Sequence, residues 1–391
     1  KLELNGNNTV LSGSKNHAGI EKADVNGTGT LTIKDDLNDN GKEKSGTDAT
    51  GTLVAGGCYS GAGIGGGAYH DEKDYADTSN ITITGGDITA SGGYYGAGIG
   101  AGCYGDASNI RIEGNAHVTA FSDGSAAIGS GYQSQGNSDI TITDHATVEA
   151  ASLNSCAIGS GHDSSDKVTI TISGNASVNA QTRNSPAAIG SDTFSTTVNI
   201  EDHADVTAVG GYGVAIGTGY GHDSTGYHGE TSTVINITGG TVNAVTLHDS
   251  KPAIGTVKGN LDVTINSSTG KTTVNTYTTG SDSLPLIGTG HYDSPSWKYS
   301  TSPSEGAEYN EDGSSNLGED NAAIINFYRN TPLGTGTYDA PETLDDGAFH
   351  PTLEFQGTIL RSTSSLTKTK VTSPRSSTTA STWTRPSTPA S

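Results

Sequence analysis

The chain has 391 residues, of which 56 are Gly and only 31% are hydrophobic, and its formal net charge is -22. This charge argues against nucleic acid and anionic lipid as partners, because both are bound through clustered Lys and Arg. No apolar run approaches the roughly 18 residues of a spanning helix, and no basic and then apolar leader precedes Lys1. We therefore expect no membrane insertion, and we expect a soluble fragment or a processed chain.

The first segment, residues 1–50, is expected to form N-terminal capping or irregular coils. The strand-like pieces LELNGNNTVLSG and GTGTLTIKDD fit one or two such coils, and the polar residues at 42–47 fit a loop. Regular repeats begin at about residue 51.

Residues 51–295 carry two motifs that recur together about every 30 residues. The first is Ala/Gly-Ile-Gly, and the second is a pair of alternating strands such as ITITGGDITA from Ile81. Three short strands per repeat, with no helical periodicity, predict an all-β solenoid, the parallel β-helix. Equivalent residues of successive coils should stack into two interior ladders. One comprises Ile83, Ile112, Ile142, Ile172, Ile200, Ile237 and Ile265, and the other comprises Ile64, Ile99, Ile128, Ile158, Ile189, Ile216, Ile254 and Ile287.

The C-terminal quarter loses the repeat. Residues 296–360 are expected to form an irregular C-terminal cap, in which the apolar piece at 322–327 closes the open end of the helix. Residues 361–391 are rich in Ser and Thr, contain no acidic residue, and should be disordered. Such a tail fits a stalk or a linker toward a wall anchor, although its break in charge also permits a shifted reading frame.

The cysteines and histidines of this chain give only weak indications of disulfides or metal sites. Cys156 directly precedes an Ala-Ile-Gly motif and is expected to be buried small filler, whereas a bridge between Cys58 and Cys103 stays open. His145 and His203 fall at a corner that carries Asn in alternate coils, and we expect a corner ladder there rather than a metal site.

The segments GAGIGGG at 61–67, GAGIGAG at 96–102 and NITITGGDITA at 80–90 resemble the Gly-rich repeats of large secreted proteins of anaerobic gut bacteria, described as carbohydrate-binding-domain or adhesin-like β-helix proteins. The resemblance covers roughly residues 50–290. It implies a right-handed parallel β-helix, an extracellular, secreted or cell-wall-attached location, and a larger surface protein as the parent. It brings no catalytic motif with it.

A ring followed by a carboxylate recurs just after the Ile-Gly motif, and further tyrosines precede the motif in Gly-rich loops at Tyr59, Tyr94, Tyr95 and Tyr212. Aromatic faces with carboxylates between them suit sugar rings and their hydroxyls, which favours a non-catalytic module that binds polysaccharide or host glycan. Ring and carboxylate could instead shield strand ends and cap turns. The expected ligand-binding residues are Tyr69, Asp71, Tyr104, Asp106, Tyr132, His162, Asp163, Tyr220, His222, Asp223, His291, Tyr292 and Asp293.

Three other functions compete with glycan binding. A structural spacer explains the repeat without a ligand. A polysaccharide lyase or glycoside hydrolase would need clustered carboxylates or a calcium site with a base, and no such motif accompanies the Gly-His-Asp at 161–163. An ice-binding Thr array is interrupted by charges at Arg111 and Glu113. No cofactor is expected, apart from a possible Ca²⁺ bound by Asp side chains and loop carbonyls.

Overall fold

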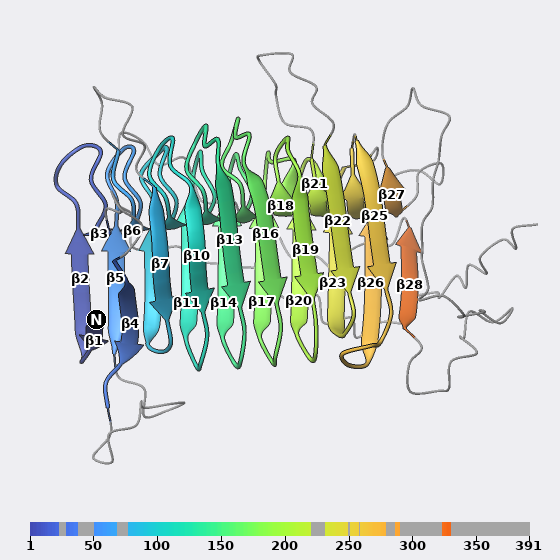
Figure 1. Cartoon of the computed structure of the whole chain (residues 1–391), viewed down its shortest axis with the longest axis horizontal. Helices are drawn as coiled ribbons and strands as arrows, with labels where there is room; N and C mark the ends of the chain where they lie inside the picture. The colour runs from blue at the N-terminus through green and yellow to red at the C-terminus, as the bar shows by residue number, and fades with distance from the viewer. Residues whose placement is uncertain are drawn as a thin grey trace, which may run out of the picture.

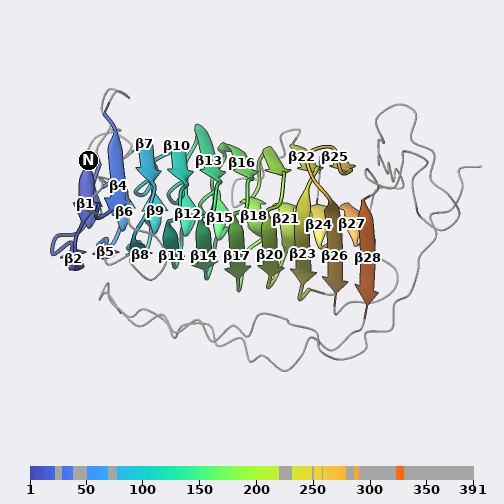
Figure 2. The same cartoon turned by 90° about the horizontal axis from the view of Figure 1, so that it is seen from below.

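The computed structural model describes residues 1–22, 29–37, 51–68, 77–219, 231–248, 251–257, 259–278, 286–289 and 323–329. The regular elements in these ranges are all β-strands, and they form three parallel sheets along one elongated body (Figure 1). The chain passes through sheets A, B and C in turn and then returns to sheet A one position further along. Figure 2 shows the same progression from β1 to β28 from below. The molecule is therefore a right-handed parallel β-helix with three strands per coil, as predicted.

Each sheet takes one strand from each successive coil. Sheet A contains β1 (Leu2–Leu4), β4 (Leu31–Asp35), β7 (Thr78–Ile83), β10 (Ala107–Ile112), β13 (Asn137–Ile142), β16 (Lys167–Ile172), β19 (Thr196–Ile200), β22 (Ser232–Ile237) and β25 (Asn260–Ile265). Sheet B contains β2 (Asn7–Leu11), β5 (Thr52–Gly56), β8 (Asp87–Ser91), β11 (His117–Ser122), β14 (Thr147–Ser152), β17 (Ser177–Thr182), β20 (Asp205–Gly210), β23 (Gly240–Thr246), β26 (Thr272–Thr278) and β28 (Ile324–Arg329). Sheet C contains β3 (Ile20–Glu21), β6 (Ile64–Gly65), β9 (Ile99–Gly100), β12 (Ile128–Gly129), β15 (Ile158–Gly159), β18 (Ala187–Ser191), β21 (Val214–Thr218), β24 (Ile254–Thr256) and β27 (Ile287–Thr289).

Both predicted isoleucine ladders are confirmed. Ile142, for example, pairs in register with Ile112 on one side and with Ile172 on the other, and the same register runs through the remaining coils. The ladder that starts at Ile64 is continuous in sheet C. Every member of both ladders is at most 6% exposed. A narrow core is sufficient because each coil shares its apolar face with two neighbours.

The corner between sheets A and B is held by alternating Gly and Asp in the left-handed conformation. Gly114, Asp144, Gly174 and Asp202 all have φ between 60° and 68°. The Asp144 carboxylate accepts a hydrogen bond from the Gly114 N–H at 3.0 Å, and Asp202 accepts one from Gly174 at the same distance. A corner ladder is present, but the prediction named the wrong residues. Its side-chain bonds come from the residue before His145 and before His203, whose own N–H groups donate to the Gly114 and Gly174 carbonyls at 2.9 Å.

The Gly of each Ile-Gly pair also has a backbone that only glycine adopts readily. Its φ lies between 134° and 150° in every described copy, and from Gly65 to Gly255 the carbonyl oxygen of the next coil approaches it closely. This requirement explains why Gly recurs with the buried Ile. The ladder comprises Gly65, Gly100, Gly129, Gly159, Gly190, Gly217, Gly255 and Gly288.

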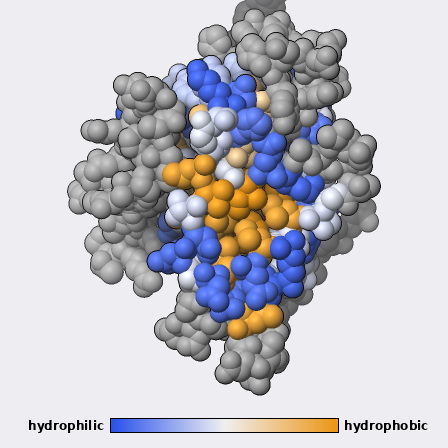
Figure 3. All heavy atoms as spheres, turned by 90° about the vertical axis from the view of Figure 1, so that its left-hand side faces the viewer, coloured by the Kyte–Doolittle hydropathy of each residue, from blue (hydrophilic) through white to orange (hydrophobic). Residues whose placement is uncertain are grey.

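Residues 1–22 supply one strand to each sheet, and these strands pair with β4, β5 and β6. Figure 3 looks onto this end of the body, where hydrophobic residues occupy the centre of the described surface and hydrophilic residues surround them. Leu11 and Val10 are among the exposed hydrophobic side chains here. At the other end, β28 pairs with β26 in sheet B. The 361–391 tail and most of 296–360 lie outside the described residues.

The three cysteines are all free thiols. Cys156 is fully buried and packs with Ala187, Val214 and Val257, which confirms its role as small filler. In the ranges that the structure describes, no helix is long and apolar enough to cross a bilayer.

Candidate functional site

The loops before and after the Ile-Gly motif lie on the same side of the body. The turn around β9 is closed by the Ala97 N–H, which donates to the Ala101 carbonyl at 2.9 Å. The loop before one motif then meets the loop after the next, because the Tyr132 N–H donates to the Tyr95 carbonyl at 3.3 Å. Two sets of tyrosines that are separate in the sequence thus share one surface.

Five tyrosines gather there, and we call them the aromatic patch: Tyr59, Tyr94, Tyr95, Tyr104 and Tyr132. Tyr95 is central. Its ring centroid lies 5.5 Å from that of Tyr59, 4.6 Å from Tyr94 and 4.8 Å from Tyr132. The first two contacts are edge to face, with interplanar angles of 88°. The Tyr104 N–H donates to the Tyr132 carbonyl at 2.7 Å, which joins the fifth tyrosine to the patch.

Three rings of the patch face solvent. Tyr59 is 43% exposed, Tyr94 45% and Tyr104 47%, whereas Tyr95 and Tyr132 are half-buried. The predicted set included Tyr104 and Tyr132 but missed the other three, which were noted only as tyrosines that precede the motif. Burial of the Tyr95 hydroxyl, with the neighbouring tyrosines, raises the pKa of Tyr95 above its usual value.

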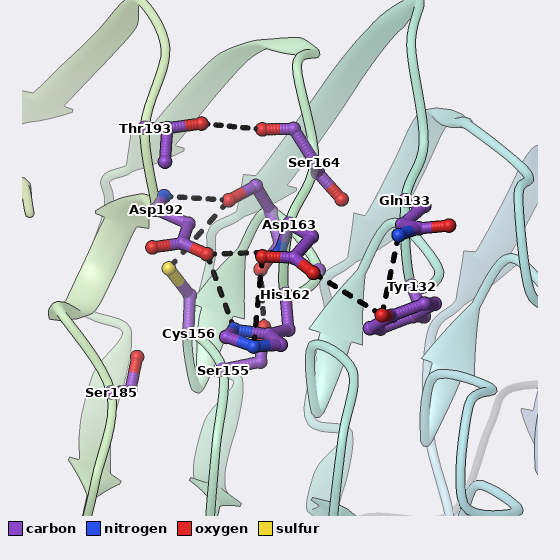
Figure 4. A network of polar contacts seen from close by, with 12 residues as sticks. Tyr132, Gln133, Ser155, Cys156, His162, Asp163, Ser164, Ser185, Asp192 and Thr193 are labelled. Carbon is purple, nitrogen blue, oxygen red and sulfur yellow. Dashed lines mark hydrogen bonds and ion pairs between the residues drawn. The ribbon is translucent and has the colours of Figure 1, made fainter. Parts of the chain in front are cut away.

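The row of rings continues from Tyr132 to His162, whose centroids are 6.0 Å apart, and ends at two carboxylates (Figure 4). Tyr132 donates its hydroxyl hydrogen bond to Asp163 Oδ2 at 3.2 Å. His162 lies between the two carboxylates, with Nε2 3.7 Å from Asp163 Oδ1 and Nδ1 3.3 Å from Asp192 Oδ2. We call His162, Asp163 and Asp192 the acidic histidine cluster.

The charges in the acidic histidine cluster shift the pKa values of its neighbours. The Asp192 carboxylate raises the pKa of His162, with help from Asp163, against the opposing effect of burial. The contact of Nδ1 with Asp192 has the length of an ion pair but not the alignment of a hydrogen bond. Burial and the Asp163 carboxylate raise the pKa of Tyr132 to about 12, so its hydroxyl stays protonated and remains a donor.

Buried serines hold these loops in position. Ser130 and Ser160 directly follow their Ile-Gly pairs and are fully buried. The Ser130 hydroxyl accepts from the Gly161 N–H at 2.9 Å, and the Ser160 hydroxyl accepts from the Asp192 N–H at 2.8 Å. Each serine therefore fixes the start of the next loop, and His162 and Asp192 come to lie on adjacent coils.

Sequence reasoning missed Asp192 because the loop after Gly190 is shorter than its predecessor and carries a carboxylate without a preceding ring. The pattern used to select ligand-binding residues was a ring followed by a carboxylate, and this loop lacks the ring. The position of Asp192 in the repeat, just after Ile-Gly-Ser, was the sequence feature that could have identified it.

Asp106 has a structural role. Its Oδ1 accepts from the Gly136 N–H of the next coil at 2.9 Å, and burial raises its pKa to about 6. This contact is the one expected if Asp106 caps a turn, and ligand binding by Asp106 stays a prediction. The other predicted ligand-binding residues lie outside the described residues: Tyr69, Asp71, Tyr220, His222, Asp223, His291, Tyr292 and Asp293.

The two carboxylates of the acidic histidine cluster approach within the spacing of about 5 Å that retaining glycosidases use. Asp192 is nevertheless fully buried, so it cannot contact a sugar carbon. The surface that remains accessible consists of aromatic rings, the Asp163 carboxylate and one imidazole edge. That composition suits binding of a polar ligand with apolar faces.

Comparison with known families finds the Beta helix repeat at residues 81–103, 110–132 and 235–256. The first two matches span β7 to the loop after β9 and β10 to the loop after β12, and so include Tyr94, Tyr95 and Tyr132. No curated protein and no solved structure matches the chain. The repeat matches and the three parallel sheets make this chain a parallel β-helix protein.

Proposed function

We propose that this protein is a non-catalytic extracellular module that binds a polysaccharide or a host glycan through the aromatic patch. The observation that carries the proposal is that two exposed rings, Tyr59 and Tyr94, pack on the half-buried Tyr95. A third exposed ring, Tyr104, belongs to the same patch through its backbone hydrogen bond to Tyr132. Sugar rings present apolar C–H faces that stack on aromatic side chains, and their hydroxyls bond to neighbouring polar groups.

Four of the five rings of the aromatic patch are held in place by one another before any ligand arrives. Tyr94 and Tyr59 both pack edge to face on Tyr95, and Tyr95 in turn packs on Tyr132. Rings fixed by such contacts lose little conformational entropy on binding, which favours affinity. The Asp163 carboxylate at the end of the row offers an acceptor for a sugar hydroxyl.

The charge of the chain favours neutral glycans. With a formal net charge of -22, the surface repels sulfated and uronic polymers unless a cation intervenes. Several weak contacts along an elongated body add up when the ligand is a polymer, as in other multivalent binding. A role within a larger secreted or wall-attached surface protein agrees with the Gly-rich repeat and with the elongated shape.

A glycan array probed with the full chain, with and without calcium, tests the proposal. We expect binding to neutral glycans, and we expect Tyr94→Ala to weaken it about 10-fold, the equivalent of roughly 1.4 kcal/mol for one stacking ring. Tyr212→Ala is the matched control, because Tyr212 is 60% exposed and packs on His248, in the equivalent turn four coils beyond Tyr95.

Three results would contradict the proposal. Silence across a broad array would favour the structural spacer. Release of reducing or unsaturated sugar in a parallel assay would make the protein an enzyme. Equal weakening by Tyr94→Ala and Tyr212→Ala would place the binding surface elsewhere.

A further inference from the structure

The acidic histidine cluster has the composition and the spacing of a metal site. One ring nitrogen of His162, one carboxylate oxygen of Asp163 and one of Asp192 all lie within 4.8 Å of one another. In Figure 4 the two carboxylates and the imidazole ring converge from adjacent coils. Ligand atoms that bind one zinc ion at about 2.0–2.2 Å lie roughly 3–3.5 Å apart, so small side-chain rotations would complete the geometry.

The polar atoms of this cluster are incompletely paired. Asp192 is fully buried, and its Oδ1 makes no hydrogen bond. His162 Nδ1 is also buried and makes none, although it points at Asp192 Oδ2 from 3.3 Å. A buried polar atom without a partner costs free energy. Both unpaired atoms belong to residue types that commonly ligate metals, and both lie within the acidic histidine cluster.

The charges of the cluster do not balance either. Across the described ranges, the cationic partner of Asp163 and of Asp192 is His162 in both cases, and no Lys or Arg pairs with them. Two carboxylates therefore share one imidazole. A buried carboxylate is stable in a protein only when it is paired or bound to a cation.

We propose that His162, Asp163 and Asp192 bind a divalent first-row transition metal ion of the zinc type. The imidazole nitrogen selects against Ca²⁺, which prefers oxygen ligands throughout, and favours Zn²⁺ and its neighbours in the series. Three protein ligands leave one or two coordination positions open. His162 and Asp163 are both partly exposed, so these positions face solvent, where water or a ligand can occupy them.

Groups around the cluster hold the ligands in place. The Asp163 N–H donates to Asp192 Oδ2 at 3.0 Å, and the Tyr132 hydroxyl donates to Asp163 Oδ2 at 3.2 Å. The Asp192 N–H is held by the Ser160 hydroxyl. Partners of this kind orient metal ligands, and their loss typically lowers metal affinity 10–100-fold.

The chain contains a matched control for this site. His117 Nδ1 lies 3.0 Å from Asp87 Oδ1, which is the same type of contact between adjacent coils. This pair has no third ligand among the described residues, and both side chains are about half exposed. A metal that binds any exposed His and Asp pair would bind here as well.

Isothermal titration calorimetry of the chelator-treated full chain with Zn²⁺ tests the proposal without any sugar, so its outcome is independent of glycan binding. We expect one tight site. His162→Gln and Asp163→Asn should each weaken it at least about 100-fold, because loss of a ligand costs more than loss of its hydrogen-bond partner. Tyr132→Phe should weaken it about 10-fold, and His117→Gln should leave it unchanged.

Three results would overturn the proposal. Zn²⁺ affinity could be unchanged in both ligand variants, or Ca²⁺ could bind in place of Zn²⁺ without dependence on His162, or no ion could bind. Circular dichroism of each variant shows whether it is folded. Asp163 has a φ of 54°, a conformation that Asn also adopts readily, so Asp163→Asn keeps the backbone and decides the matter if His162→Gln fails to fold.

Discussion

The carbonyl oxygen of Gly159 lies where a side chain on Gly129 would have to be. A Cβ built on Gly129 would lie only 1.9 Å from this oxygen, and the φ of Gly129 is 142°. The same approach recurs at every Ile-Gly pair of sheet C from Gly65 to Gly255. The glycine ladder therefore sets how closely the coils stack at the turn that supports the aromatic patch.

Gly129→Ala should destabilise the protein by more than about 3 kcal/mol. The added methyl group overlaps backbone, which cannot rotate away, and the positive φ adds strain of its own. Urea unfolding followed by circular dichroism measures the change. Gly13→Ala is the control, because a Cβ at Gly13 meets no atom within 4 Å. Similar midpoints for the two variants would contradict the role of the ladder.

Ile142→Ala should cost about 2–5 kcal/mol, because it opens a cavity in the middle of a fully buried ladder. The neighbouring Thr141 sits on the outer face of the same strand, and Thr141→Ala should change stability by less than about 0.5 kcal/mol. Chemical denaturation of both variants gives the comparison. A cost for Ile142→Ala as small as that for Thr141→Ala would show that the core is not shared between coils.

The stability of the protein should fall as the pH rises from about 4 to 7, and Asp166 should be one cause. Burial raises the pKa of this fully buried carboxyl from its usual 3.8 to about 6, although Ser138 donates to it at 3.1 Å. Because the folded-state pKa of Asp166 lies above its unfolded value, the contribution of Asp166 to stability is fully present below pH 3.8. This contribution is lost as the pH rises through about 6. The loss corresponds to about 3 kcal/mol.

Asp166→Asn tests this expectation. The unfolding free energy of this variant should equal that of the parent protein near pH 4 and exceed it near pH 7.5. Asp106, whose pKa is also raised to about 6 and which senses the Asp166 charge, should retain part of the pH dependence. A variant that is less stable than the parent at both pH values would contradict the expectation that ionisation of the buried Asp166 carboxyl destabilises the fold.

The imidazole of His117 should titrate above its usual pKa of 6.5, because it shares a hydrogen bond with the Asp87 carboxylate, whose own pKa is lowered. The contribution of protonated His117 to stability is present below pH 6.5 and is lost as the pH rises through the raised pKa of His117. The Asp87 contribution is present above 3.8 and is lost in acid. The pair thus stabilises the fold between these limits, weakly, since both side chains are half exposed.

An NMR titration of the His117 ring measures this shift directly. Asp87→Asn should lower the pKa of His117 toward 6.5, and Glu149→Gln should lower it less, because Glu149 acts on His117 only through its charge. A larger effect from Glu149→Gln than from Asp87→Asn would show that Asp87 is not the main cause of the raised pKa of His117.

Much of the architecture could be predicted from the sequence. A two-residue alternation inside a repeat of about 30 residues places Ile142 between Ile112 and Ile172, because a parallel β-helix stacks equivalent residues at the strand spacing. The position of Cys156 in the repeat likewise predicted its burial. Such inferences succeed because strand pairing is local and periodic, so one coil predicts the next.

The site depended on information that the repeat does not contain. The sequence by itself determined the strands, the ladders and the recurrence of rings near the Ile-Gly motif. Only the tertiary structure decided that Tyr95 of one coil packs on Tyr132 of the next, and that Asp192, in a shorter loop, reaches His162. The path of a loop depends on the hydrogen bonds that close its turn and on the neighbouring coil, and a loop that differs in length from its neighbours escapes the periodicity that predicts the strands.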